Sequence, residues 1–257
     1  MSRKIVIAVV GAIAVGAFIW QQQRAQPTAV SPVTRVQLPL PVPALHTVQR
    51  NDSAPMPVES EDETAHIPIP GMLDGSDEMT RAAAHELSPT LLKWLIPEQQ
   101  IRKWVVLVDA AADGKLPTKD LPLLFPMPAF DVISVDDTTR MNPQNFTRAN
   151  LLIDTVTAID VQKLANYYHA WRPVLEIAYK ELGREGSFKM RLQLALQNVL
   201  DAPVLPENTA LVQPKVYYIY ADPALEKSSG LNKLLWRLGT ANQRQLQSYL
   251  GGLLPLL

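Results

Sequence analysis

Residues 160–182 read DVQKLANYYHAWRPVLEIAYKEL, and their hydrophobic side chains repeat with the period of an α-helix. Asp160 is expected to cap the start of this helix, and Gly183 to follow its end. Pro173 lies inside the run, so we expect a kink or two abutting helices near Ala170. The stripe that would face a core consists of Leu164, Tyr167, Tyr168, Trp171, Val174, Leu175, Ala178 and Leu182.

The segments on either side of this run also have helical periodicity. Pro97 and Gly114 are expected to mark the first turn and the end of one helix, and Gly239 and Thr240 the end of another and the cap of the next. Asn142-Pro143 is expected to open the helix that carries Leu151, Leu152 and Val156. The helices are expected over residues 98–112, from Asn142 past Val156, from Ser187 to Val199, over 231–238 and from Thr240 to Leu253.

Signals for β-strands are few. Phe130 to Val135, followed by Asp136-Asp137, predicts a short strand that leads into a turn, and Val216 to Tyr220 is rich in β-branched and aromatic residues. The sequence therefore predicts a mainly α fold: one helical domain over residues 71–257 with a small β element.

An apolar block precedes this domain. The segment from Ile5 to Trp20 has no charged side chain, and as a helix it would be roughly 24 Å long against a bilayer core of about 30 Å. Arg3 and Lys4 come directly before it and only Arg24 follows closely, which favours a cytoplasmic N-terminus. We therefore predict an uncleaved single-pass anchor over residues 1–24. A cleaved signal peptide is the alternative, although no small-residue cleavage site follows the block.

One face of the predicted membrane helix carries small residues. Ala8, Ala12 and Gly16 recur at four-residue spacing, a pattern that lets membrane helices approach one another closely. The same spacing also arises because Ala and Gly are common in such helices, so self-association is one reading of it.

Residues 25–70 are expected to form a Pro-rich, disordered linker. Nine of the 22 prolines lie between Gln21 and Pro70, and the run from Leu38 to Pro43 favours an extended polyproline conformation. The main interpretation is a semi-rigid spacer between membrane and domain, and the alternative is a docking segment for a groove-type partner.

The composition of residues 71–257 excludes several kinds of site. These residues hold 19 Lys+Arg and 20 Asp+Glu, a net charge of −1, and so lack the basic footprint of a nucleic-acid-binding protein. The chain has no cysteine, which excludes disulfides and Cys-type metal sites.

No motif for a cofactor, a metal ion or a standard catalytic centre is present. None of the four histidines, His46, His66, His85 and His169, has a partner at metal-binding spacing, and no Gly-rich phosphate loop or Gly-x-Ser-x-Gly turn occurs. Ser228 and Ser229 are interpreted as capping residues for the helix that follows. We therefore predict no catalytic residues, no metal and no cofactor.

Four charged residues are the candidates for a polar network or a binding site. Arg102 and Asp109 are seven positions apart on one predicted helix and so lie on nearly the same face, from which they could meet Asp222 or Arg237. Asp222 precedes Pro223, an arrangement typical of a helix N-cap. A structural role is the main interpretation for this network and a binding pocket the alternative, because a buried charge needs a partner.

Several short motifs occur in the order found in a bacterial family, catalogued as domain of unknown function 3014, which residues 71–250 resemble. Where the family pattern usually has Val-Asp-Asn this chain has Val-Asp-Ala at 108–110, and 146–149 read Phe-Thr-Arg-Ala instead of a Tyr-Ala-Arg-Tyr type stretch. The resemblance implies the layout of anchor, linker and domain and a Gram-negative type envelope, and it implies no activity. The motifs are MLDGSD at 72–77, QIRKWVVLVD at 100–109, GKLP at 114–117, AYKELG at 178–183, YADPALE at 220–226 and LLWRLG at 234–239.

The layout predicts a single-pass protein of the bacterial inner membrane, with its N-terminus in the cytoplasm and its domain in the periplasm. The leading hypothesis is a non-catalytic interaction or scaffold module that binds an envelope protein. The alternatives are an envelope hydrolase or transferase that uses carboxylates such as Asp109 and Asp222, and a membrane regulator that senses a small ligand.

Overall fold

The structure is a computed structural model that describes residues 67–117 and 119–257. The predicted membrane segment from Ile5 to Trp20, its small-residue face (Ala8, Ala12 and Gly16) and most of the Pro-rich linker lie outside these residues. Within them, no helix is both long and apolar enough to cross a bilayer.

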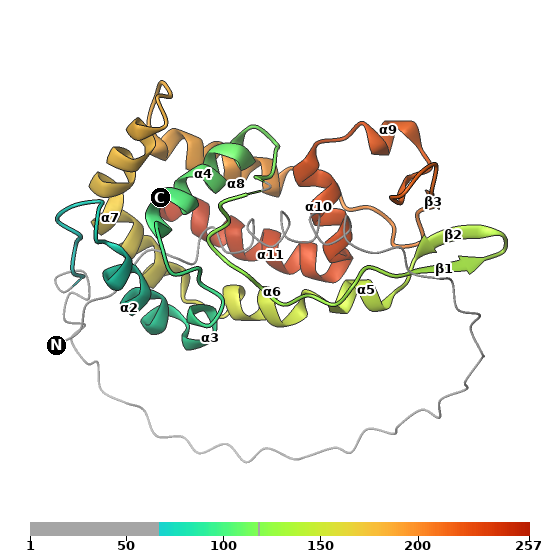
Figure 1. Ribbon diagram of the computed structural model, residues 1–257, viewed down its shortest axis with the longest axis horizontal. Coiled ribbons are helices and arrows are strands. Elements are labelled where there is room, and N and C mark those ends of the chain that lie inside the picture. Colours follow the sequence, from blue (N-terminus) through green and yellow to red (C-terminus); the bar gives the residue numbers. More distant parts are fainter. Residues whose placement is uncertain (1–66, 118) are drawn as a thin grey trace, which may run out of the picture.

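The described chain is mainly helical, as predicted, with two small antiparallel sheets (Figure 1). The strands are β1 (Val132–Val135), β2 (Thr138–Met141), β3 (Leu211–Val212) and β4 (Ile219–Tyr220). The helices are α2 (Asp77–Leu87), α3 (Pro89–Leu92), α4 (Gln100–Ala112), α5 (Gln144–Thr147), α6 (Asn150–Thr157), α7 (Val161–Glu181), α8 (Phe188–Leu200), α9 (Pro223–Glu226), α10 (Gly230–Leu238) and α11 (Thr240–Leu253), and a 3-10 turn, η2 (Leu254–Leu256), follows.

The molecule is elongated (Figure 1). Helices α2, α3, α4 and α7 lie toward one end, α9, α10 and the strands lie at the other, and α11 runs between them. Most buried apolar side chains form one large core in which α4 packs against α8 and α7. A smaller second core lies between the strands, α5 and α10.

Helix α7 is a single helix of 21 residues, so the expectation of two abutting helices near Ala170 is wrong. Asp160 caps its start as predicted, since the Asp160 carboxylate accepts a hydrogen bond of 2.7 Å from the backbone N–H of Lys163. Pro173 lacks the N–H that would bond to the preceding turn. Trp171 and Val174 are buried on either side of Pro173, and their packing holds the helix together across it.

Helix α4 begins at Gln100, beyond the predicted Pro97. Its start is capped from a distant part of the chain: the Asp77 carboxylate accepts hydrogen bonds from the backbone N–H groups of Gln99 (2.7 Å) and Gln100 (2.8 Å). Gln99 has a φ of 54°, which is incompatible with a helical first turn there. Gly114 follows the end of the helix in a left-handed conformation, as expected.

Three further boundaries differ from the prediction. The segment after Pro143 forms two helices, α5 and α6, rather than one. Thr240 is the first residue of α11 rather than its cap, and its backbone N–H donates to the carboxylate of Glu207 instead (2.9 Å). The predicted strand from Val216 shrinks to Ile219–Tyr220, because Val216 is 61% exposed and has no strand beside it in the described structure.

The β1–β2 hairpin agrees with the sequence. Asp136 and Asp137 both have positive φ (51° and 56°), as the favoured two-residue hairpin turn requires. Val132 pairs with Met141, and both point into the second core. An isolated bridge between Arg140 and Ala210 connects this hairpin to the β3–β4 pair.

Candidate functional site

Asp109 lies at the centre of an ion-pair cluster on the inner face of α4. Its side chain is only 8% exposed. One oxygen accepts from Nε of Arg191 at 2.6 Å, and the other lies 3.0 Å from Nη2 of Arg184. Arg191 is in the first turn of α8 and Arg184 in the loop before it, so Asp109 ties the α7–α8 connection to α4.

Asp113, which directly follows the last residue of α4, extends this cluster. It accepts a hydrogen bond of 2.6 Å from Nη2 of Arg191, which also donates to the backbone oxygen of Asp109 (2.5 Å). The hydrogen bond from Arg191 holds the pKa of the Asp113 carboxyl below its usual range, against an opposing effect of partial burial. Both carboxylates are therefore partners of Arg191, and Asp109 pairs with Arg184 as well.

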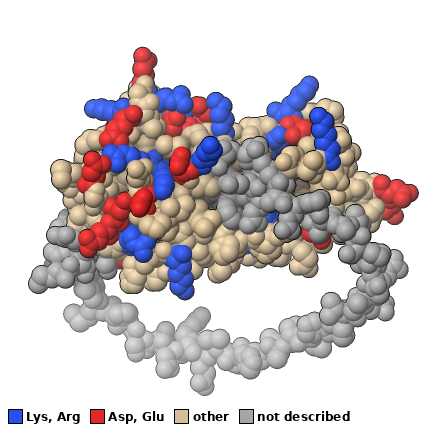
Figure 2. Space-filling model, viewed as in Figure 1, with Lys and Arg blue, Asp and Glu red and all other residues tan. Residues whose placement is uncertain are grey.

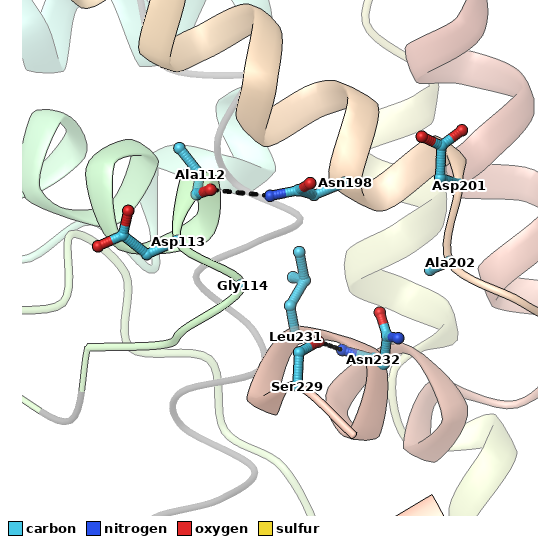
Figure 3. A pocket seen from close by; sticks show the side chains of 9 residues that line it. All are labelled: Ala112, Asp113, Gly114, Asn198, Asp201, Ala202, Ser229, Leu231 and Asn232. Atoms are coloured by element: carbon cyan, nitrogen blue, oxygen red, sulfur yellow. Dashed lines mark hydrogen bonds between the residues drawn. The ribbon is translucent and has the colours of Figure 1, made fainter. Parts of the chain in front are cut away.

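A polar pocket of about 420 Å³ opens beside this cluster, between the end of α4, α8 and the start of α10 (Figure 3). Much of its polar lining completes helix ends. The Asn198 amide donates to the backbone oxygens of Ala111 (3.0 Å) and Ala112 (2.9 Å), which end α4. The pocket is lined by Ala112, Asp113, Gly114, Asn198, Asp201, Ala202, Ser229, Leu231 and Asn232.

The remaining polar groups of the pocket have limited chemistry. Ser229 accepts from the backbone N–H of Asn232 (3.0 Å) and so caps α10, as predicted. Asp201 accepts from the Gln197 amide (2.8 Å), and Asp113 bonds to Arg191. Since the lining contains no histidine or lysine, no hydroxyl in it is paired with a general base of the usual kind.

The structure places the four candidate residues in separate environments. Within the described part of the chain, no hydrogen bond or ion pair joins any two of Arg102, Asp109, Asp222 and Arg237. Arg102 pairs with Glu181 (2.6 Å) and Asp74 (2.8 Å) on the surface. Asp222 caps α9 by accepting from the backbone N–H of Ala224 at 2.8 Å, and Arg237 borders the second core.

The partners of Asp109 were missed in the sequence. Arg184 and Arg191 are more than 70 residues away from Asp109, and no local spacing rule connects positions that far apart. The only signal was the need of an inward-facing Asp109 for a counter-charge.

Neither the histidines nor the carboxylates point to a metal ion. Residues 67–117 and 119–257 contain no group of three or more His, Asp and Glu side chains placed to hold one. His169 lies with Nε2 2.7 Å from the backbone oxygen of Leu256 and so connects the C-terminal turn to α7.

Charge is mixed over the face seen in Figure 2, where acidic and basic side chains alternate over the α4–α7 end and no large area of one sign is visible. This distribution agrees with the net charge of −1 for the whole chain. An extended nucleic-acid backbone would find no continuous basic track on this face.

The ion pairs predict how stability changes with pH. Hydrogen bonds from Arg191 and Arg102 hold the pKa values of Asp113 and Glu181 below their usual ranges. In acid the unfolded chain therefore binds more protons than the folded chain, so this stabilisation is complete above the unfolded pKa values of about 4 and is lost as the pH falls through the folded values.

The measurement is the unfolding temperature at about pH 6 and about pH 3. Between these two conditions the unfolding temperature of the wild type should fall further than that of the double variant Asp113→Asn, Glu181→Gln, which lacks both titrating groups. Equal losses would show that these carboxylates do not set the acid sensitivity.

The described residues form a class of fold in which helices pack around one large apolar core, with an ion-pair cluster beside it, and they contain no recognisable catalytic centre. A family model described as "Protein of unknown function (DUF3014)" matches residues 100–253, more than half of the chain. The protein therefore belongs to this family. No curated protein and no solved structure matches the chain.

Proposed function

We propose that this protein is a single-pass protein of the bacterial inner membrane whose periplasmic domain, residues 71–257, is a non-catalytic module that binds another envelope protein. The single observation that carries the location is the uncharged segment from Ile5 to Trp20, directly behind Arg3 and Lys4. The proline-rich stretch that follows gives the domain a spacer away from the bilayer.

The non-catalytic part of the proposal rests on how the charged side chains are used. Asp109 accepts from one arginine and pairs with a second, and Asp222 caps α9, so neither carboxylate is placed as a general acid or base. Carboxylate catalysis requires two such groups facing one cleft with pKa values set apart. The hydrolase or transferase alternative is weaker for this reason.

The surface offers apolar side chains for a protein partner. Met190 and Leu194 lie one turn apart on α8, 67% and 45% exposed. Large exposed apolar side chains close together are typical of protein contacts, while a small-ligand sensor needs an enclosed apolar pocket. The pocket between α4, α8 and α10 has both polar and apolar lining, and much of its polar lining completes helix ends.

The location is tested by reporter fusions to the C-terminus of the full-length chain in a Gram-negative host. We expect an alkaline phosphatase fusion, which folds only in the periplasm, to be active, and a fluorescent protein fusion that needs the cytoplasm to be dark. The matched control lacks residues 2–24 and should reverse both results.

Alkaline carbonate extraction then separates an anchor from a cleaved signal peptide. The proposal predicts that the full-length protein stays with the membranes at its uncut size. A shortened, soluble product would support the signal-peptide reading, and an inactive phosphatase fusion would contradict the periplasmic location.

A further inference from the structure

The second core, which is rich in aromatic side chains, lies at the end of the molecule that holds the strands (Figure 1). Two arginines, Arg148 and Arg237, border it. Tyr220 and Trp236 contact each other edge to face, with ring centroids 5.5 Å apart. Phe130 and Tyr218 pack at the margin of this core. The core itself consists of Val132, Met141, Phe146, Leu211, Tyr220 and Trp236.

Arg148 and Arg237 lie at the ends of two helices, α5 and α10, that pack against each other. Arg148 directly follows α5, and Arg237 lies in the last turn of α10. The two helices are held by a hydrogen bond of 2.7 Å from the Asn242 amide to the backbone oxygen of Phe146 and by the close approach of Gly239 to Phe146. Burial, and then the positive charge of Arg237, lower the pKa of Arg148 to about 10.

Neither arginine has a carboxylate partner in the described structure. The Arg148 guanidinium donates through Nη1 to the side-chain oxygen of Asn145 (2.9 Å) and lies 5.9 Å from the centre of the Phe130 ring. Its Nε is buried without a partner. For Arg237 no hydrogen bond or ion pair exists among the described residues, although the side chain is mostly buried and burial lowers its pKa.

The carboxylate whose charge acts on Arg237 is already engaged. Glu226 favours the charged form of Arg237, but its carboxylate accepts from Nζ of Lys233 (2.8 Å) and from the backbone N–H of Tyr220 (3.0 Å). The hydroxyl of Tyr220 is a further buried polar group without a partner. Arg140 does not belong to this group. Side chains alternate along a strand, so Arg140 lies on the face of β2 opposite to that of Met141, which points into the second core.

Two half-buried guanidinium groups at one end of the fold, without an anion, are costly, because a buried charge is normally paired. We infer that Arg148 and Arg237 bind an oxyanion, the carboxylate or phosphate group of a small molecule, with the Tyr220 hydroxyl as a further hydrogen-bond donor. Guanidinium groups match the geometry of both anions. The inference goes beyond the proposed function, since it does not depend on where in the cell the domain lies.

The test is thermal unfolding of the full-length protein in detergent with sodium phosphate or sodium succinate, each against sodium chloride at the same ionic strength. A ligand that binds only the folded state raises the unfolding temperature, by an amount that grows with the ratio of its concentration to its Kd. We expect the wild type to be stabilised by at least one of the two anions beyond chloride. Stabilisation by phosphate alone would identify a phosphate group as the ligand, and stabilisation by succinate alone would identify a carboxylate.

The variants Arg148→Gln and Arg237→Gln should bind the effective anion about tenfold or more weakly, as expected for the loss of a charge-assisted hydrogen bond. The control Arg172→Gln removes the same charge from an exposed position on α7 and should respond like the wild type. Tyr220→Phe, which keeps the packing and removes only the hydroxyl, should weaken binding by a smaller factor.

In chloride alone the two glutamine variants should be as stable as the wild type or more stable, because each removes the repulsion between the positive charges of Arg148 and Arg237. A lost response therefore cannot be attributed to unfolding. Absence of a response in the wild type, or an equal response in all variants, would overturn the inference. Neither outcome bears on the membrane topology, which the reporter fusions test separately.

Discussion

Replacing Gly239 with alanine is expected to destabilise the protein by about 3 kcal/mol or more, through backbone strain added to overpacking. Gly239 joins α10 to α11 with φ 86° and ψ 159°, a conformation that is essentially restricted to glycine. A Cβ atom at this position would lie 2.7 Å from Cβ of Phe146, which cannot move without shifting the backbone of α5. The measurement is the free energy of unfolding in urea.

Gly252→Ala is the matched control for this substitution. Gly252 lies near the end of α11, and an added Cβ would meet nothing within 4 Å. Alanine there should be neutral or stabilise by up to about 1 kcal/mol, because it restricts the unfolded chain and favours the helix. A Gly239→Ala variant as stable as Gly252→Ala would mean that α5 does not pack against the α10–α11 junction as described.

Replacing Asp109 with asparagine is expected to destabilise the protein by about 3 kcal/mol, at the low end of the range for breaking a buried ion pair. The change leaves Arg191 and Arg184 without their main partner. Arg191 keeps its hydrogen bond to Asp113, which limits the loss. The free energy of unfolding is measured by urea unfolding of the full-length protein in detergent, from the midpoint and slope of the transition.

The control makes the same change at Asp201→Asn, an exposed position at the end of α8. Its effect should stay within about 0.5 kcal/mol, as for most surface substitutions. If both variants were equally stable, Asp109 would not be needed for the fold and would become available for chemistry. That result would favour the carboxylate-based hydrolase alternative over the non-catalytic proposal.

Local signals predicted much of the helical framework. Asp160 and Asp222 cap the helices they were expected to cap, because an N-cap acts within three residues of itself in the sequence. Gly114 and Gly183 follow helix ends in left-handed conformations for the same reason. Apolar periodicity identified the buried face of α7 almost residue by residue.

Features set by distant parts of the chain could not be predicted in this way. The start of α4 depends on Asp77 and that of α11 on Glu207, both far from the helices they cap. The segment from Val216 has strong β propensity, yet only Ile219 and Tyr220 pair, because a strand also needs a neighbour along its length. Tertiary contacts decided these cases against local preference.

In the candidate site, too, the sequence predicted the local requirement but not the distant residues that meet it. The sequence indicated that an inward-facing Asp109 needs a counter-charge, and the structure supplies it from Arg191 and Arg184 rather than from the proposed Arg237. Arg237 instead lies near Arg148, an arrangement that depends on the packing of α5 against α10. Pairs of residues so far apart in sequence become neighbours only through the fold.

The proposed role as a binding module is tested most directly by crosslinking in intact cells. Full-length protein is crosslinked, purified and analysed by mass spectrometry, beside a control in which an inert domain replaces residues 71–257 behind the same anchor and linker. The account predicts one envelope protein recovered in yield comparable to the bait, lost in the control and reduced by Met190→Glu and Leu194→Glu together. Recovery of only the protein itself, or of the same proteins with the control, would contradict it.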